Sequence, residues 1–196
     1  MNNEIRMDAL LPVEMAKKAE DIGVKKANMS FIDTFVLAIL AGAFIALGAV
    51  FATTVSAGSY AIKGADGALA FSAGLPYGVT RLLTGLVFTL GLILVVVGGA
   101  ELFTGNNLIV MAFSSGKVSL AKLLRNWGIV YLGNLVGSVA TAVIIFISKQ
   151  YTFGSGAIGL TMLNIGEAKT NLGFLQAIAL GVMCNALVCL AVWLCY

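Results

Sequence analysis

Residues 98–107 read GGAELFTGNN, and they lie in the middle of a long apolar stretch. That stretch extends from Leu82 to Gly116, and its 35 residues include one charged side chain, Glu101. A straight helix of this length would measure about 52 Å at 1.5 Å per residue, whereas the hydrocarbon core of a bilayer is about 30 Å thick. The stretch therefore predicts a helix to about Gly99, a break near residues 99–107, and a second short helix from about Asn107.

The whole chain has the composition of a membrane protein. Of its 196 residues 60% are hydrophobic and 11% are charged, where a soluble domain carries about 25% charge. Three further stretches are free of charge and exceed the roughly 20 residues that span a bilayer: Thr34–Ile62, Asn126–Ser148 and Thr170–Tyr196. We predict an all-α polytopic membrane protein with an N-terminal segment, 1–33, and a transmembrane domain, 34–196. Its spans are predicted at about 34–62, 82–116, 126–148 and 170–196.

The distribution of Lys and Arg predicts the orientation. The N-terminal segment and the connection after the broken stretch hold eight of them, and the alternate connections hold four. Because cytoplasmic loops carry the excess of positive charge, we expect the N-terminus in the cytoplasm of a multi-pass protein of the cytoplasmic membrane. Before the first span, residues 11–20 predict an amphipathic helix on the membrane surface, with Pro12 at its start. The net charge of +3 is scattered, so we expect no nucleic-acid partner.

The break itself is the candidate site. Irregular backbone cannot face lipid, so it must face protein or a water-filled path. Phe103 and Thr104 begin a run whose hydroxyl, amide and backbone N–H groups can replace part of an anion's water shell, and a following helix N-terminus favours negative charge; otherwise they are ordinary turn residues. Glu101 either caps a helix near the interface or is buried, accepting hydrogen bonds from the backbone around residues 104–107. We assign the bracing of the loop to Glu101, Gly105, Asn106 and Asn107.

Two polar residues near or within the last span have alternative interpretations. Lys169 is either an interfacial lysine whose ammonium extends to the headgroups or an attractor of anions at a pore mouth. Asn185 lies mid-span and needs a partner inside the bundle, where it either braces a helix or lines a pore.

Enzyme chemistry is not expected. The sequence contains no histidine, and its three cysteines lie in one apolar run without the spacing of a metal site. The spans show no paired acids and no nucleophile with a base. We therefore expect no catalytic residue, no metal and no cofactor.

Three motifs in this sequence resemble the formate–nitrite transporter family: Gly98–Asn106, Gly133–Gly137 and Asn185–Trp193. The run Leu11–Ala16 is most similar to that of its formate channel branch. The resemblance implies a homopentamer in the lipid bilayer, each protomer an aquaporin-like bundle of six helices with its own pore and an interrupted second helix.

The resemblance also implies roles for individual residues. Phe88 and Leu92 are similar to the hydrophobic lining of the second helix, and Phe103 to the cytoplasmic constriction. Thr104 resembles the polar residue beside this constriction. Lys169 resembles the lysine that attracts anions, and Asn185 resembles the polar residue of the fourth helix near the pore.

The chain departs from the family pattern by stopping after its fourth span, before the fifth helix and its central histidine. We therefore interpret it as a fragment with four of the six spans, which we expect not to transport by itself. Its expected substrate is a small monovalent anion, formate, carried passively or with a proton across a bacterial or archaeal membrane. Nitrite and hydrosulfide are alternative substrates. A non-conducting membrane scaffold is a second alternative for the function.

Overall fold

The computed structural model describes residues 10–58, 60–63 and 69–196. Its elements follow in the order α1 (Pro12–Ala27), α2 (Phe31–Ser56), β1 (Tyr60–Lys63), β2 (Leu69–Ala73), α3 (Tyr77–Val97), α4 (Phe103–Asn106), α5 (Ile109–Ser114), α6 (Leu120–Ile147), the 3₁₀ turn η1 (Gln150–Thr152), α7 (Ala157–Thr170) and α8 (Phe174–Trp193). Four of these helices, α2, α3, α6 and α8, are long and apolar enough to cross a membrane. The predicted helical membrane fold is confirmed, with one small antiparallel hairpin, β1–β2, added to it.

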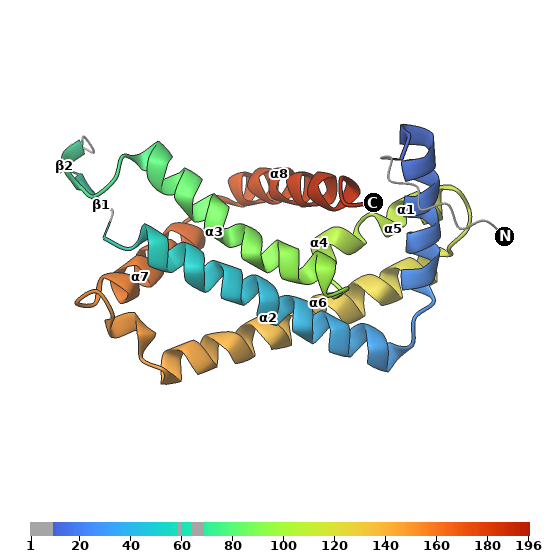
Figure 1. Ribbon diagram of the computed structural model, residues 1–196, viewed down its shortest axis with the longest axis horizontal. Coiled ribbons are helices and arrows are strands. Elements are labelled where there is room, and N and C mark those ends of the chain that lie inside the picture. Colours follow the sequence, from blue (N-terminus) through green and yellow to red (C-terminus); the bar gives the residue numbers. More distant parts are fainter. Residues whose placement is uncertain (1–9, 59, 64–68) are drawn as a thin grey trace, which may run out of the picture.

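Helix α2 is the centre of the packing, with α3 on one side and α6 on the other (Figure 1). Glycines allow the backbones to approach closely. A β-carbon on Gly42 of α2 or on Gly137 of α6 would overlap backbone carbonyl oxygen of the facing helix, and one on Gly133 would lie 2.5 Å from Ala38 Cβ. The spacing of Gly133 and Gly137 therefore produces close packing between helices of the same chain.

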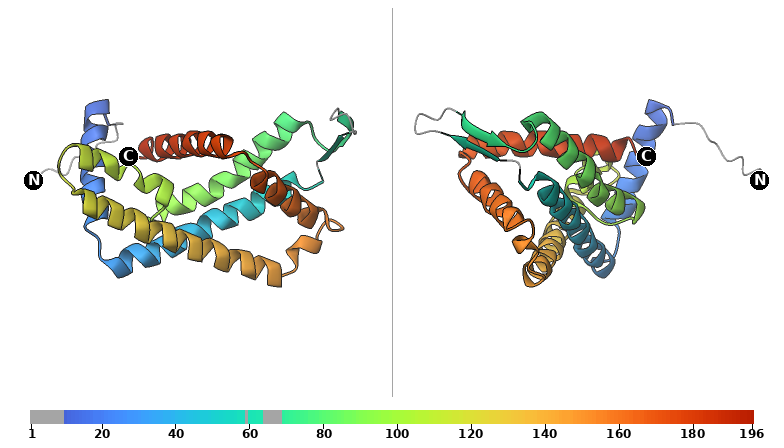
Figure 2. Two further views of the ribbon diagram at one scale, coloured as in Figure 1. Left: turned by 180° about the vertical axis from the view of Figure 1, so that it is seen from behind. Right: turned by 60° about the vertical axis from the view of Figure 1, so that its left-hand side comes forward.

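Helix α8 lies apart from the α2–α6 pair and contacts the rest mainly through α4, as the two views in Figure 2 show. Every residue of α8 is at least partly exposed. The attachment of this helix to the described part of the chain therefore depends on the interrupted segment.

Helix α1 is docked at one end of the bundle against α5. Apolar contacts join Ala27, Ile109, Ala112, Val118 and Leu123, and Lys117 forms an ion pair of 2.6 Å with Glu20. The hydrogen bond from the Lys117 ammonium lowers the pKa of the Glu20 carboxyl below its ordinary 4.5, and the same bond raises the pKa of Lys117 above 10.5. Both groups are therefore charged at neutral pH, and the pair fixes α1 beside the loop after α5.

The helix bounds differ from the charge-free runs at several ends. Helix α2 ends at Ser56 rather than residue 62, because the chain turns into the hairpin there. Helix α3 begins at Tyr77 and includes Arg81, whose guanidinium lies 4.9 Å from the Tyr77 ring centroid. A count of uncharged residues does not detect the turn after Ser56. It also misplaces the start of α3, because a long cationic side chain such as that of Arg81 can extend out of the apolar layer while its helix continues.

The bounds of the helices also differ from the third and fourth charge-free stretches. Helix α6 begins at Leu120 rather than residue 126, since Ser119 caps it by accepting from the Lys122 N–H. Before α8, residues 157–170 form α7, a helix that the charge count treated as a connection.

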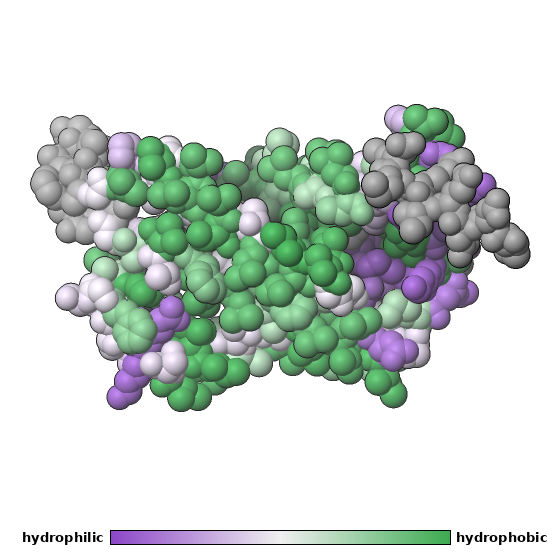
Figure 3. All heavy atoms as spheres, viewed as in Figure 1, coloured by the Kyte–Doolittle hydropathy of each residue, from purple (hydrophilic) through white to green (hydrophobic). Residues whose placement is uncertain are grey.

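Hydropathy is distributed as a membrane protein requires (Figure 3). Apolar side chains cover the middle of the visible face, and hydrophilic ones gather toward the two ends, most densely near α1. Helix α7 and the hairpin lie at the end opposite α1 (Figure 1).

Candidate functional site

The interruption begins where α3 ends at Val97. Gly99 has φ +65°, a left-handed conformation that glycine adopts without strain. The chain then turns back toward α2, where the Glu101 N–H donates to the Leu37 carbonyl at 3.2 Å. A bond between two spans thus replaces one that a continuous helix would have made.

The predicted break at 99–107 is too long. Non-helical backbone covers residues 98–102, and Phe103–Asn106 forms a helical turn, α4, which leads to α5. The reason is that helical bonds such as Asn106 N–H to Leu102 O, 2.8 Å, satisfy polar backbone groups that an irregular loop would leave unpaired.

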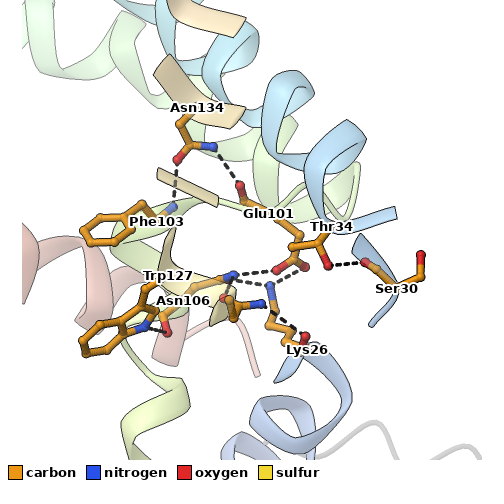
Figure 4. A network of polar contacts seen from close by, with 9 residues as sticks. Lys26, Ser30, Thr34, Glu101, Phe103, Asn106, Trp127 and Asn134 are labelled. Atoms are coloured by element: carbon orange, nitrogen blue, oxygen red, sulfur yellow. Dashed lines mark hydrogen bonds and ion pairs between the residues drawn. The ribbon is translucent and has the colours of Figure 1, made fainter. Parts of the chain in front are cut away.

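Asn134 of α6 holds the start of this turn. Its side-chain oxygen accepts the Phe103 N–H at 2.9 Å, and its amide nitrogen donates to the carbonyls of Glu101 at 2.9 Å and Ala38 at 2.8 Å. The Phe103 N–H lies in the first turn of α4 and has no partner within that helix. One side chain therefore joins α2, the break and α6 (Figure 4).

Glu101 is buried, with 3% of its surface exposed. Its carboxylate accepts from the Asn106 amide at 2.6 Å and from the Lys26 ammonium at 2.8 Å (Figure 4). The carboxylate is therefore buried within the protein, as the second interpretation expects. The predicted donors were backbone N–H groups of residues 104–107, whereas the observed ones are the side chains of Asn106 and Lys26. The Asn106 N–H is bound to the Leu102 carbonyl instead.

Asn106 is the most connected residue of the site. Its side-chain oxygen accepts from Lys26 at 3.0 Å, and its amide nitrogen donates to Glu101 and, at 2.9 Å, to Asn126 of α6. Its backbone carbonyl accepts from the Trp127 indole at 3.0 Å. These bonds fix the end of α4 between α1 and α6, beside a cavity of about 400 Å³ that Lys26, Glu101 and Asn106 help to line.

Another side of α4 faces α8. The Asn107 amide donates to the Asn185 side-chain oxygen at 3.3 Å and to the Phe103 carbonyl at 2.9 Å. The Cys189 thiol donates to the Thr104 carbonyl at 3.2 Å. Asn185 thus has a partner in the bundle, and the structure brings together the predicted residues of the loop and of the last span.

Aromatic packing sets the position of the Phe103 ring. It makes edge-to-face contacts with Trp127 at 6.3 Å and Tyr131 at 5.4 Å between centroids. Both partners lie on α6, so the ring is held on the same helix that holds its backbone.

Three of the predicted site residues lie outside the network of contacts around α4. Phe88 is 37% exposed and Leu92 is half-buried, both within α3 before the break. Lys169 is exposed in the last turn of α7, at the end of the molecule opposite α1.

Sequence reasoning missed four residues of the site: Lys26, Asn126, Trp127 and Asn134. A signal existed for the two asparagines, since an amide in an apolar span requires a partner. Lys26 gave no such signal, because it lies 75 residues from Glu101 in the sequence. Within residues 10–58, 60–63 and 69–196, no cluster of three or more His, Cys, Asp or Glu could hold a metal.

The fold and this site define a multi-pass helical membrane protein with an interrupted span braced by buried polar side chains. The model of the formate/nitrite transporter family matches residues 13–196. The chain therefore belongs to the formate/nitrite transporter family, as its motifs predict.

Known proteins are similar to it over most of its length. A formate channel of Escherichia coli K12 is 41% identical over 189 residues, which is 96% of this chain and 62% of the relative. A formate channel of Haemophilus influenzae is 40% identical over all of this chain and 64% of its own length. A solved pentameric formate channel with formate bound has a TM-score of 0.72 and 47% identity, over 83% of this chain and 59% of that one. The chain thus spans less than two thirds of the length of these relatives.

Proposed function

We propose that this chain forms the larger part of a channel for a small monovalent anion, with formate as the substrate. The observation that carries the proposal is the braced turn α4, which places Thr104 and Asn107 beside Asn185 of α8. The names of the relatives support formate over nitrite and hydrosulfide.

The chemistry of α4 suits such an ion. A carboxylate that leaves water must find donors to replace part of its shell. The Thr104 hydroxyl of α4, the amide of Asn107 directly after it and the amide of Asn185 on α8 are such donors. Phe103, with Phe88 and Leu92 on α3, would supply the apolar constrictions that exclude larger hydrated ions. These roles define a path along α3, α4 and α8.

The proposal includes the assembly and its orientation. The chain would form a homopentamer in the cytoplasmic membrane, as supported by the similar pentameric formate channel. The N-terminus and α1 would lie in the cytoplasm, in agreement with the eight-to-four split of Lys and Arg. Lys117 pairs with Glu20 of α1, and Lys122 donates to Asn28 directly after α1, whereas Lys169 lies in the last turn of α7 at the opposite end.

The test compares two proteins in liposomes loaded with formate. One is residues 1–196, and the other is a six-span version, in which these residues are followed by the fifth and sixth spans of a formate channel relative. We expect formate efflux from the six-span version and none from the four-span chain, whose polar groups on α4 and α8 lack the remaining helices. A six-span version that forms pentamers but passes no formate would contradict the proposed function, and equal efflux from both would contradict the need for the missing spans.

Lys169 is proposed to concentrate anions at the mouth of this path. In the six-span version, Lys169→Met is expected to lower formate efflux about two- to tenfold, since steering by local charge changes access rates by about this factor or more. The melting temperature should stay nearly constant, because the side chain is exposed. Lys149→Met, which removes an exposed lysine from the connection after α6, is the control and should leave efflux unchanged. A lower melting temperature with unchanged efflux would assign Lys169 to the membrane interface.

A further inference from the structure

We propose that Cys189 of α8 is a positioning residue for the selection of anions over cations, because its thiol covers the backbone carbonyl of Thr104 beside the proposed path. The inference rests on the proposed function and deepens it, since it names a residue that sets which sign of charge the path accepts.

The carbonyl groups of α4 determine which charge this turn favours. The last carbonyls of a helix have no partner within that helix, and bare carbonyl oxygens replace the water shell of the ion in potassium channels. Carbonyl oxygens that faced the path would therefore repel formate and attract potassium. An anion path along α4 is favoured when a donor covers each of these carbonyls.

Each of the four carbonyls of α4 has its own donor in the structure. Three of the bonds are Asn107 amide to Phe103 O at 2.9 Å, Leu108 N–H to Gly105 O at 3.1 Å and Trp127 indole to Asn106 O at 3.0 Å. The fourth carbonyl, that of Thr104, accepts from the Cys189 thiol at 3.2 Å. In a continuous helix the Leu108 N–H would bind the Thr104 carbonyl, but here it is bound to Gly105, and the donor comes from α8 instead.

Thr104 keeps its own donor available. Among residues 10–58, 60–63 and 69–196 its hydroxyl has no hydrogen-bond partner, and the residue is half-buried. With its carbonyl bound to the thiol, Thr104 can donate its O–H to an ion beside it without its own carbonyl oxygen competing.

Cys189 also contacts Asn185, which lies one turn earlier on α8. The Asn185 amide nitrogen lies 3.8 Å from Cys189 Sγ, and the Asn185 side-chain oxygen accepts from the Asn107 amide at 3.3 Å. That oxygen is therefore covered as well. A neutral thiol is a donor that adds no charge, so Cys189 changes the polarity of the path without changing its net charge.

The expected size of the effect follows from the partial negative charge of an unpartnered carbonyl. The interaction of a unit charge with such groups at a helix end corresponds to a change of about two- to fivefold in a rate. Because a thiol is a weak donor, loss of its bond should alter selectivity more than it alters the fold.

The experiment uses the six-span version in liposomes. It compares Cys189→Ala, which removes the donor, with Cys189→Ser, whose hydroxyl can donate to the same carbonyl. Cys184→Ala is the matched control, since Cys184 is exposed on the same helix. The readouts are the permeability of formate relative to potassium, from the reversal potential, and the yield of pentamers.

We expect Cys189→Ala to lower the permeability ratio about two- to fivefold, whereas Cys189→Ser and Cys184→Ala should leave it nearly unchanged. All three variants should form pentamers in normal yield. Rescue by serine separates a donor role from a packing role, since alanine and serine differ by the hydroxyl alone.

Three results would overturn the inference: an unchanged ratio in Cys189→Ala, an equal fall in Cys189→Ala and Cys189→Ser, or a loss of pentamers in Cys189→Ala, which would assign the thiol to the fold alone. Each of these is distinct from failure of the proposed function, in which the unsubstituted six-span version itself passes no formate.

Discussion

Replacing Gly137 with alanine is expected to remove nearly all folded protein. A β-carbon there would overlap the Ile39 carbonyl oxygen and lie 2.9 Å from the Ala43 nitrogen, all backbone atoms of α2. Backbone in a helix cannot move aside as a side chain can, so α2 and α6 would have to separate along their main contact. Overpacking of this kind costs about 3 kcal/mol or more, and the separation would also disturb Asn134, three residues before Gly137. The yield of monodisperse protein in detergent and its melting temperature measure the effect.

Gly128 is the matched control on the same helix. No heavy atom lies within 4 Å of a β-carbon built there, and alanine favours a helix over glycine by up to about 1 kcal/mol. Gly128→Ala should therefore leave the yield unchanged and keep or raise the melting temperature. Similar losses in both variants would mean that the α2–α6 contact is not the cause.

Replacing Asn134 with leucine is expected to destroy the site while leaving the long helices in place. The variant loses three hydrogen bonds, and it leaves the Phe103 N–H and the Glu101 carbonyl of the break without the partner that they have now. Each unpaired buried group costs about 1–3 kcal/mol. We expect a clear fall in melting temperature and, in the six-span version, at least a tenfold loss of formate efflux.

Ser138 provides the control for this substitution. Its hydroxyl donates to the Leu135 carbonyl of its own helix and the residue is half-buried, so Ser138→Ala should alter neither property. Normal efflux in Asn134→Leu would show that α4 keeps its position through Glu101, Asn106 and α8 without the bonds of Asn134.

The spans and the interruption could be predicted because their signals are local. The excess length of residues 82–116 and the glycines at 98 and 99 are visible in the sequence, and a bilayer limits how they can fold. The prediction placed the end of the break at 107, because glycine and asparagine at 105–107 are typical of turns. In the structure Asn106 continues the helical turn, since its side chain finds partners on α1 and α6.

The bracing of the site could be predicted only in part. Glu101 stood out as an acid within an apolar stretch, and a buried acid requires donors. Which donors it finds depends on where α1 docks, and nothing near Lys26 in the sequence indicates a contact with residue 101. In the same way, Asn185 required a partner, but its bond to Asn107 depends on the packing of α8 against α4.

The glycine contacts of α2 divide the molecule into a scaffold and an adjustable part. Gly42 and Gly48 bring α2 so close to α6 and α3 that these helices meet through backbone atoms, and separating them would open voids that lipid cannot fill. Helix α4 is attached instead by side-chain hydrogen bonds to α1, α6 and α8, which can break and re-form one at a time. Thermal motion on the timescale of ion passage should therefore be concentrated in α4 and its partners, around a framework that stays still.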